Sequence, residues 1–274
     1  MKLQFTNNYR PRFDQISRIM QFLHTNDGCK KVSLKDIIDA LGIPDRQTKG
    51  LISMMTGFGL VTPRTTLLTQ IGKAIIQFDA YFDKLETLWI IHYIVSSEPE
   101  WVIWHRIINK VLPFQDTFEA DKVSIKYFSD LSTNYSQITI SEKIPTEVGA
   151  VFAAYTRSEL SRLRILDIEK TGKFIKTIPV DIPDLAFFFC LVYFRDKYLP
   201  GSTAMNIQDI CVSENSPGRV MNLPEYQVRA ILSRLHDAGL LRLEQLANLD
   251  QVRFSDSTSQ ESVLKQIYGG SDVN

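Results

Sequence analysis

A passage that repeats near the two ends of the chain restricts its fold more than any other sequence feature. Met55-Thr-Gly-Phe-Gly-Leu-Val61 follows one amphipathic run, and His236-Asp-Ala-Gly-Leu-Leu241 follows another. In each passage a helical pattern ends at glycine, which permits the backbone of a tight corner, and a short apolar run follows. The repetition predicts a helix, a glycine corner and a strand at both ends of the chain.

The N-terminal passage is preceded by three helical patterns. They cover residues 10–25, 34–41 and 46–55, and Ser33 and Gly42 are placed to begin and end the second of them. The link between the second and third patterns is short, and a small hairpin and a further helix at 70–76 follow the corner. This order is typical of a winged helix-turn-helix module.

The C-terminal passage has the same elements. Pro224 lies near the start of an apolar stripe that runs to Leu235, and residues 240–243 and 250–254 read as two strands. Between the ends, aromatic-rich runs predict buried helices, and a short hairpin is expected from Ile165-Leu166 and residues 174–178. We expect a mainly α chain with winged helix-turn-helix modules at both ends, short β-wings and a helical middle. The expected divisions are an N-terminal winged-helix domain at 1–80, a helical middle at 81–200, a C-terminal winged-helix-like domain at 201–268 and a disordered tail at 269–274, the chain being polar from Ser255 onward.

Composition excludes a polycation, because the formal net charge of the 274 residues is zero. The charge is unevenly placed, however: residues 1–76 carry eleven Lys and Arg against five Asp and Glu, whereas residues 181–274 carry eight against twelve. The electropositive N-terminal end is either an anion-binding surface or a chance distribution of solvated charges. The longest apolar run, at 185–194, is too short to span a bilayer, and the three cysteines have no metal-type spacing. We expect a soluble cytoplasmic protein without a membrane partner.

The third helix carries side chains that suit contacts to phosphates and base edges. Thr48 is expected to point outward with them, while Leu51, Ile52 and Met55 face the core. The alternative is a winged helix that contacts protein. The predicted DNA contacts are Lys30, Lys31, Lys35, Arg46, Gln47, Lys49, Ser53 and Arg64 near the N-terminus, and Arg229 and Arg234 near the C-terminus, with Arg242 and Arg253 on the second wing.

No nucleotide-binding or hydrolase motif of the common kinds is present. Asp181, Asp184 and Asp196 are the weak candidates for a catalytic acidic group, and the alternative is a pair of loop carboxylates followed by an unrelated aspartate. His92 and His105 lie in aromatic runs and are expected to be hydrogen-bonded core residues. No metal-binding set is defined by the sequence; Mg²⁺ or Mn²⁺ is expected only if the protein nicks DNA.

Four segments together resemble a known family. They are residues 9–13, 85–92, 101–109 and 216–223, the last with the helix that follows it and Gln251-Val-Arg253. In this order they resemble the bacterial family numbered 4007 in the domain-of-unknown-function series, whose members are similar to SspB. The family often has a His-Glu-Thr-Phe-like opening where this chain has Thr6-Asn-Asn-Tyr9. The positions matched to the family are Arg10, Pro11, Arg12, Phe13, Trp89, His92, Trp104, Asn109, Pro217, Gly218 and Arg219.

The resemblance implies a function that composition alone does not. It implies a DNA-binding component of a bacterial DNA phosphorothioation and anti-phage defence system, which nicks DNA to allow sulfur insertion. The implied partners are double-stranded DNA and the cysteine desulfurase, ATP pyrophosphatase and ATPase of the same system; a homodimer is left open. The alternative is a scaffold or regulator without activity, whose winged helices contact proteins.

Overall fold

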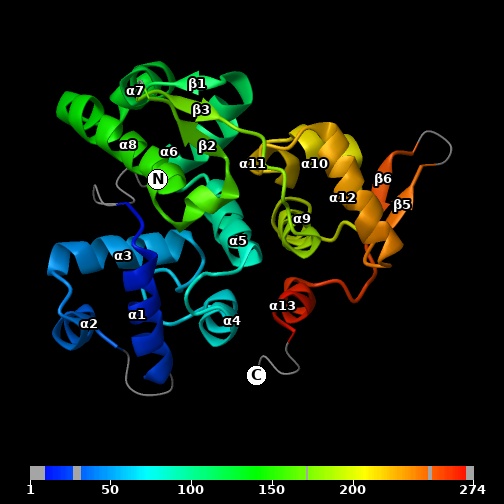
Figure 1. Cartoon of the computed structure of the whole chain (residues 1–274), viewed down its shortest axis with the longest axis horizontal. Helices are drawn as coiled ribbons and strands as arrows, with labels where there is room; N and C mark the ends of the chain where they lie inside the picture. Colours follow the sequence, from blue (N-terminus) through cyan, green and yellow to red (C-terminus); the bar gives the residue numbers. More distant parts are fainter. Residues whose placement is uncertain (1–9, 27–31, 171, 246–248, 270–274) are drawn as a thin grey trace.

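The computed structural model describes residues 10–26, 32–170, 172–245 and 249–269, and all structural statements below concern these parts of the chain. The described chain is mainly helical and contains two small antiparallel sheets (Figure 1). In Figure 1 the N-terminal helices lie at the lower left, the first sheet lies above them, and the second sheet lies at the right, with the middle of the chain and α9 between the two ends. The tail at 270–274 lies outside the described residues, as do Lys30 and Lys31.

The N-terminal helices form where the sequence predicts them. Ser33 accepts a hydrogen bond from the Asp36 backbone N–H, and the Asp36 carboxylate accepts one from the Ser33 backbone N–H. Gly42 ends the same helix with a left-handed φ of 66°. A β-bridge between Val61 and Leu68 closes the turn that follows the third helix. The helices are α1 (Phe13–Thr25), α2 (Leu34–Leu41), α3 (Asp45–Gly57) and α4 (Gln70–Phe78).

The middle of the chain combines buried helices with a three-stranded sheet of order β1-β3-β2. The predicted hairpin is confirmed: β2 (Leu166–Ile168) pairs antiparallel with β3 (Phe174–Lys176). The third strand, β1 (Thr117–Phe118), was not predicted. The helical elements are α5 (Leu85–Ser96), α6 (Val102–Arg106), η1 (Ile107–Val111), η2 (Leu112–Phe114), α7 (Ala120–Phe128), η3 (Ser129–Thr133), η4 (Thr139–Lys143), α8 (Ile144–Arg157) and η5 (Glu159–Leu163).

The C-terminal part contains the second sheet, of order β4-β6-β5. The two predicted strands form β5 (Arg242–Glu244) and β6 (Gln251–Arg253), and the additional strand β4 (Ala204–Asn206) pairs with β6. A further helix, α13 (Gln260–Tyr268), was not predicted in the polar stretch after Ser255, and it packs against α9 and α4. The remaining helices are α9 (Asp184–Tyr198), α10 (Ile207–Val212), α11 (Pro217–Val220) and α12 (Glu225–Asp237).

A single cluster of buried apolar side chains extends from Phe13 to Tyr268. Its centre is α5, which has apolar residues on nearly all sides and contacts α6, α9, α11 and η5. A helix that is apolar all round must be enclosed by other elements, as the sequence pattern predicts. None of the helices in the described parts of the chain has both the length and the apolar character needed to span a bilayer.

Candidate nucleic-acid interface

The buried side chains of α3 determine which face of the helix is exposed to solvent. Leu51, Met54 and Met55 are buried. Thr48 is buried as well, and its hydroxyl donates to the carbonyl oxygen of Ile43 at 3.2 Å. The expectation that Thr48 points outward is therefore wrong, because the turn before the helix supplies a buried acceptor for its hydroxyl. The outer face begins with Arg46 and Lys49.

The charges on this face are only partly compensated. Lys49 forms an ion pair with Asp45 one turn earlier, at 2.8 Å and with both side chains more than half exposed. Arg46 is exposed and forms no ion pair with any described residue. Gln47 is half-buried and donates to the side-chain oxygen of Gln15 at 2.6 Å, so its amide is directed at α1. Ser53 is half-exposed one turn after Lys49.

Two further predicted contacts lie near α3. Lys35 is exposed in the first turn of α2, and Arg64 is exposed in the turn closed by the Val61–Leu68 bridge, where it has a left-handed φ of 63°. Neither forms an ion pair with a described residue. The N-terminal face therefore offers cations whose charge the described parts of the chain leave uncompensated.

The cations of α12 are held by carboxylates. The Arg229 guanidinium donates to both oxygens of Asp250, at 3.0 and 2.6 Å, and to Glu225 at 2.7 Å. The hydrogen bonds from Arg229 lower the pKa of the Asp250 carboxyl. Arg234 donates to both oxygens of Asp184, which lies in the first turn of α9. The charges of both predicted contacts are thus compensated within the protein.

The chain segment before α9 lies beside α12. Val180 and Ile182 share a small hollow of about 100 Å³ with Gln227, Ala230 and Arg234 of that helix. The surface of α12 that a recognition helix would present is therefore bordered by the chain itself.

Of the three aspartates considered for catalysis, Asp196 is far from Asp184. Asp184 and Asp196 lie at opposite ends of α9, roughly 18 Å apart along a helix that rises about 1.5 Å per residue. Asp196 accepts hydrogen bonds from Arg195 and Gln260, and Asp181 is exposed before the helix. In the described parts of the chain, no three His, Cys, Asp or Glu side chains are grouped so that they could hold a metal ion.

The matched aromatic and histidine positions build a buried hydrogen-bond network. His92 is fully buried in α5, with Nε2 at 3.0 Å from the carbonyl oxygen of Val220 and Nδ1 at 2.5 Å from the hydroxyl of Tyr155. Because a carbonyl only accepts, Nε2 carries the proton and Nδ1 accepts from Tyr155. Tyr155 in turn accepts from the indole N–H of Trp104 at 2.8 Å. Burial lowers the pKa of His92 to about 4, so the ring is neutral at pH 7.

A second part of the network joins α6 and η1 to the loop before α11. His105 lies 2.7 Å from the side-chain oxygen of Asn215, and Asn109 accepts from the Asn215 backbone N–H at 2.9 Å. Tyr93 donates to the carbonyl oxygen of Asn215 at 2.8 Å. Both histidines are thus hydrogen-bonded core residues, as predicted. Asn215 was not identified from the sequence, although its left-handed φ of 69° is a conformation in which asparagine is enriched.

The Pro-Gly-Arg positions complete this junction. Pro217 begins α11, and a Cβ atom added at Gly218 would lie 2.7 Å from the carbonyl oxygen of Ile210. Arg219 lies over the ring of Phe114, with its guanidinium carbon 5.7 Å from the ring centre. Arg219 thus links the C-terminal part to the middle part, and Gly218 permits the close approach of α11 to α10.

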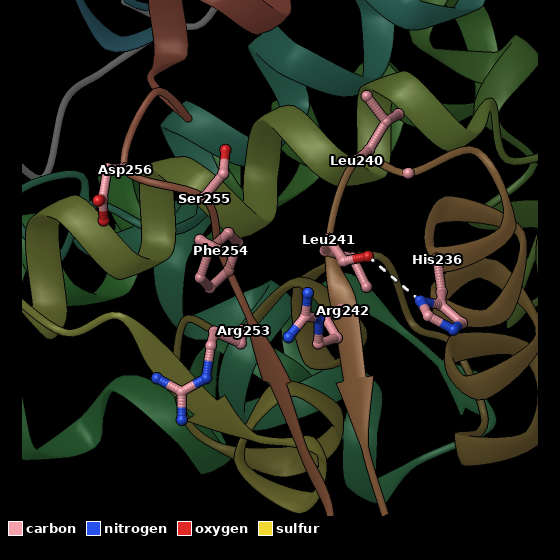
Figure 2. A pocket seen from close by; sticks show the side chains of 9 residues that line it. His236, Leu240, Leu241, Arg242, Arg253, Phe254, Ser255 and Asp256 are labelled. Carbon is pink, nitrogen blue, oxygen red and sulfur yellow. Dashed lines mark hydrogen bonds between the residues drawn. The ribbon is translucent and has the colours of Figure 1, made fainter.

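A hollow of about 530 Å³ lies beside the β5–β6 hairpin (Figure 2). Arg242 and Arg253 line it from neighbouring strands, and Ser255 and Asp256 line it from the chain that leaves β6. His236, near the end of α12, forms the opposite wall and hydrogen-bonds to the carbonyl oxygen of Leu241 at 3.3 Å (Figure 2). Arg242 and Arg253, the two predicted wing residues, thus line one concave surface.

The protein is mainly helical. Its charged faces, on α3, α12 and the β5–β6 hairpin, are exposed, and its middle and C-terminal parts are joined by a buried hydrogen-bond network. The family model described as "Protein of unknown function (DUF4007)" matches residues 35–268, and the chain belongs to this family. Two solved structures share the fold. "SspB crystal structure" has a TM-score of 0.80 and "Magnesium ion-bound SspB crystal structure" one of 0.78, each at 14% identity over 97% of this chain and 87% of that chain. No curated protein matches the chain.

Proposed function

We propose that this chain is a DNA-binding component of a bacterial DNA phosphorothioation and defence system. The fold that it shares with the SspB structures supports the system, and its N-terminal charged face supports the DNA contact. The single observation that carries the DNA contact is the outer face of α3, where Arg46 has no partner among the described residues and stands beside Lys49.

We infer that both ends of the chain are winged helix-turn-helix modules. At the N-terminal end, α2 and α3 are separated by a short link, and the turn closed by Val61 and Leu68 corresponds to the wing. At the C-terminal end, β4 lies between α9 and α10, and the β5–β6 hairpin follows α12. In such modules the helix before the wing enters the major groove, a position that α3 and α12 occupy in the two halves.

The two modules have unequal roles in this proposal. On α12, Arg229 and Arg234 are held by carboxylates, and Val180 and Ile182 lie beside the helix. The acceptors that hold these arginines would have to be replaced by phosphates before either could contact DNA. The α3 face has no such competitor for Arg46, so we assign the helix contact with DNA to α3.

The test is duplex DNA binding, measured by fluorescence anisotropy over a series of salt concentrations. Arg46→Ala with Lys49→Ala is expected to weaken binding at least tenfold, and to reduce the slope of log K against log salt by about 2 if each cation neutralises one phosphate. Lys122→Ala with Lys126→Ala, which removes the same charge from α7, is the matched control and is expected to leave the slope unchanged. Equal effects of the two double variants would refute a DNA face on α3.

The proposed function includes nicking of DNA, which is tested separately. It requires a metal-bound or base-activated nucleophile, and no step is assigned to the aspartates described above. Supercoiled plasmid is incubated with protein and Mg²⁺ or Mn²⁺, or with EDTA, and is run on a gel after protein removal. Open-circle product that needs metal would add nicking to the proposed function, and its absence would limit that function to binding.

A scaffold role is the second candidate, and exposed apolar side chains favour it. Ile178 and Val212 are about half exposed beside a hollow of about 290 Å³, and Phe114 and Val180 are more exposed still. The partners in this case are the cysteine desulfurase, ATP pyrophosphatase and ATPase. Ile178→Asp with Val212→Asp is expected to abolish co-purification with a partner while DNA binding is retained; unchanged co-purification with all three enzymes would exclude this surface.

A further inference from the structure

The β5–β6 hairpin places two arginines directly opposite each other. Arg242 and Arg253 are partners in the antiparallel register, so their side chains leave the same face of the sheet. The next pair, Leu243 and Val252, faces the core. Like charges directly opposite each other destabilise a strand pair, so this arrangement costs stability unless an anion lies between or beside them.

Among the described residues, the one carboxylate near this pair, Glu244, hydrogen-bonds to Arg253 and acts on Arg242 only through its charge. Glu244 accepts from Arg253 at 2.7 and 3.1 Å, and hydrogen bonds from Arg253 and then Gln251 lower the pKa of Glu244 to about 2. Arg253 also lies 3.3 Å from the hydroxyl of Thr203. These contacts fix the Arg253 guanidinium and leave an N–H on each terminal nitrogen.

The Arg242 side chain is exposed and forms no hydrogen bond or ion pair with any other described residue. Its side chain lines the same hollow as that of Arg253 (Figure 2). The negative side chain in the lining is Asp256, which lies on the far side of Phe254 from Arg242 (Figure 2). The hollow is therefore lined by one guanidinium that Glu244 holds and one whose side chain has no hydrogen bond to a described residue, with Ser255 and the Asp256 carboxylate toward the opposite rim (Figure 2).

We propose that this hollow binds a phosphate group, with Arg253 as its fixed ligand and Arg242 as its movable one. The planar fork of guanidinium N–H groups matches the oxygens of a phosphate, and a dianion or phosphodiester between the two arginines relieves their repulsion. The phosphate comes either from the DNA backbone, in which case the inference rests on the proposed function, or from a free phosphate compound. On DNA, the hollow gives the C-terminal module a backbone contact that α12 does not provide.

Two measurements on the full chain test this inference. The first is calorimetric titration with sodium pyrophosphate at an ionic strength held constant with NaCl. Arg242→Gln is expected to weaken pyrophosphate binding at least tenfold. The control Arg157→Gln, at an exposed arginine of α8 that pairs with no described residue, is expected to bind as the unchanged protein does. Undetectable pyrophosphate binding, or equal affinity in both variants, overturns the inference.

The second measurement is the salt dependence of duplex DNA binding with the same variants. A slope reduced by about 0.9 in Arg242→Gln identifies the DNA backbone as the source of the phosphate. An unchanged slope combined with lost pyrophosphate binding identifies a free phosphate compound. If the unchanged protein binds no DNA, the proposed function fails while the pyrophosphate result still decides the inference. The melting temperature of Arg242→Gln without pyrophosphate is expected to be no lower than that of the unchanged protein. This control shows that weaker pyrophosphate binding does not come from unfolding.

Discussion

The imidazole Nε2–H of His92 donates to the carbonyl oxygen of Val220 at 3.0 Å, although the two residues are 128 positions apart. The bond joins α5, at the centre of the core, to α11, in the C-terminal part. The ring is fully buried and its other nitrogen is also hydrogen-bonded, so its protonation would break the bond from Tyr155. The junction between the middle and C-terminal parts therefore depends on a neutral histidine.

This arrangement predicts a loss of stability in acid. The pKa of His92 falls from 6.5 to about 4 on folding, so between these values the unfolded chain binds the proton and the folded chain does not. The stabilising contribution of the neutral ring is complete above pH 6.5 and falls as the pH drops toward 4, by about 3 kcal/mol in total. The free energy of unfolding, from urea denaturation at pH 7 and pH 5, is expected to decrease more in the unchanged protein than in His92→Phe. Parallel pH profiles would contradict a buried neutral ring.

His92→Phe is also expected to destabilise the protein at pH 7. It removes the donor to Val220 and the acceptor for Tyr155, and leaves both groups buried without those partners, at a cost of roughly 2–4 kcal/mol. Tyr155→Phe removes the donor to His92 and also the acceptor for the Trp104 indole N–H, so it too leaves two buried groups without those partners and is expected to cost a similar amount. Urea denaturation of both variants and of the unchanged protein measures the two costs; a neutral His92→Phe would show that the hydrogen bonds of the ring contribute little.

At two glycines, even substitution by alanine is predicted to destabilise the protein. A Cβ at Gly72 in α4 would lie 2.2 Å from the carbonyl oxygen of Leu60, and one at Gly218 would lie within 2.8 Å of backbone atoms of residues 210 and 211. Because backbone atoms cannot rotate away, alanine at either site is expected to cost roughly 2–4 kcal/mol. Gly149→Ala, within α8 and with open space around the site, is the matched control and is expected to stabilise by up to about 1 kcal/mol. Thermal denaturation of the three variants is the check, and a neutral Gly72→Ala would show that α4 is less closely packed.

Substitution of Arg229 on α12 and of Arg46 on α3 is predicted to have opposite effects on stability and DNA binding. Arg229→Ala leaves Asp250 and Glu225 without their shared partner and is expected to cost about 1 kcal/mol of stability, a modest value because the side chain is about a third exposed. Its DNA affinity is expected to stay unchanged. Arg46→Ala is expected to weaken DNA binding without lowering the melting temperature. Anisotropy and calorimetry on both single variants test this contrast, which fails if Arg229→Ala weakens binding as much as Arg46→Ala does.

The last helix is predicted to stabilise the N-terminal half of the chain. The hydroxyl of Tyr268 lies 2.7 Å from that of Thr87, both residues are buried, and the Tyr268 ring stacks on Phe78. Tyr268→Phe keeps the ring and leaves the Thr87 hydroxyl without this partner, at an expected cost of about 1 kcal/mol. Tyr81→Phe, at a side chain that is 72% exposed, is expected to have no effect on the melting temperature. Similar melting temperatures for all three proteins would show that the hydroxyl pair contributes nothing.

The parts of the fold that could be read from the sequence are those fixed by local pattern. Apolar residues on all sides of residues 85–96 predicted an enclosed helix, and Ser33 and Gly42 marked the limits of α2. Strands β1 and β4 were missed because two or three residues carry too little pattern, and each is defined by a partner strand far along the chain. The helix α13 was missed because its apolar stripe is short and lies in a polar stretch.

The charged sites were harder to predict because their partners are remote. Arg234 and its acceptor Asp184 are 50 residues apart, so the exposed position of Arg234 in a helical pattern gave no sign of compensation. Thr48 was wrongly placed outward because its hydroxyl acceptor is a backbone carbonyl, which no side-chain pattern marks. The face of Arg46 and Lys49 was predictable because helical spacing alone determines which residues of α3 the core leaves out.

The contact between Tyr268 and Thr87 also determines when the core can be completed as the chain is translated. The two residues are 181 positions apart, so at about 5–20 residues per second the ribosome needs roughly 10 to 40 s to deliver the last helix after α5 has been made. During that interval the faces of α4 and α5 that α13 covers are open to other molecules.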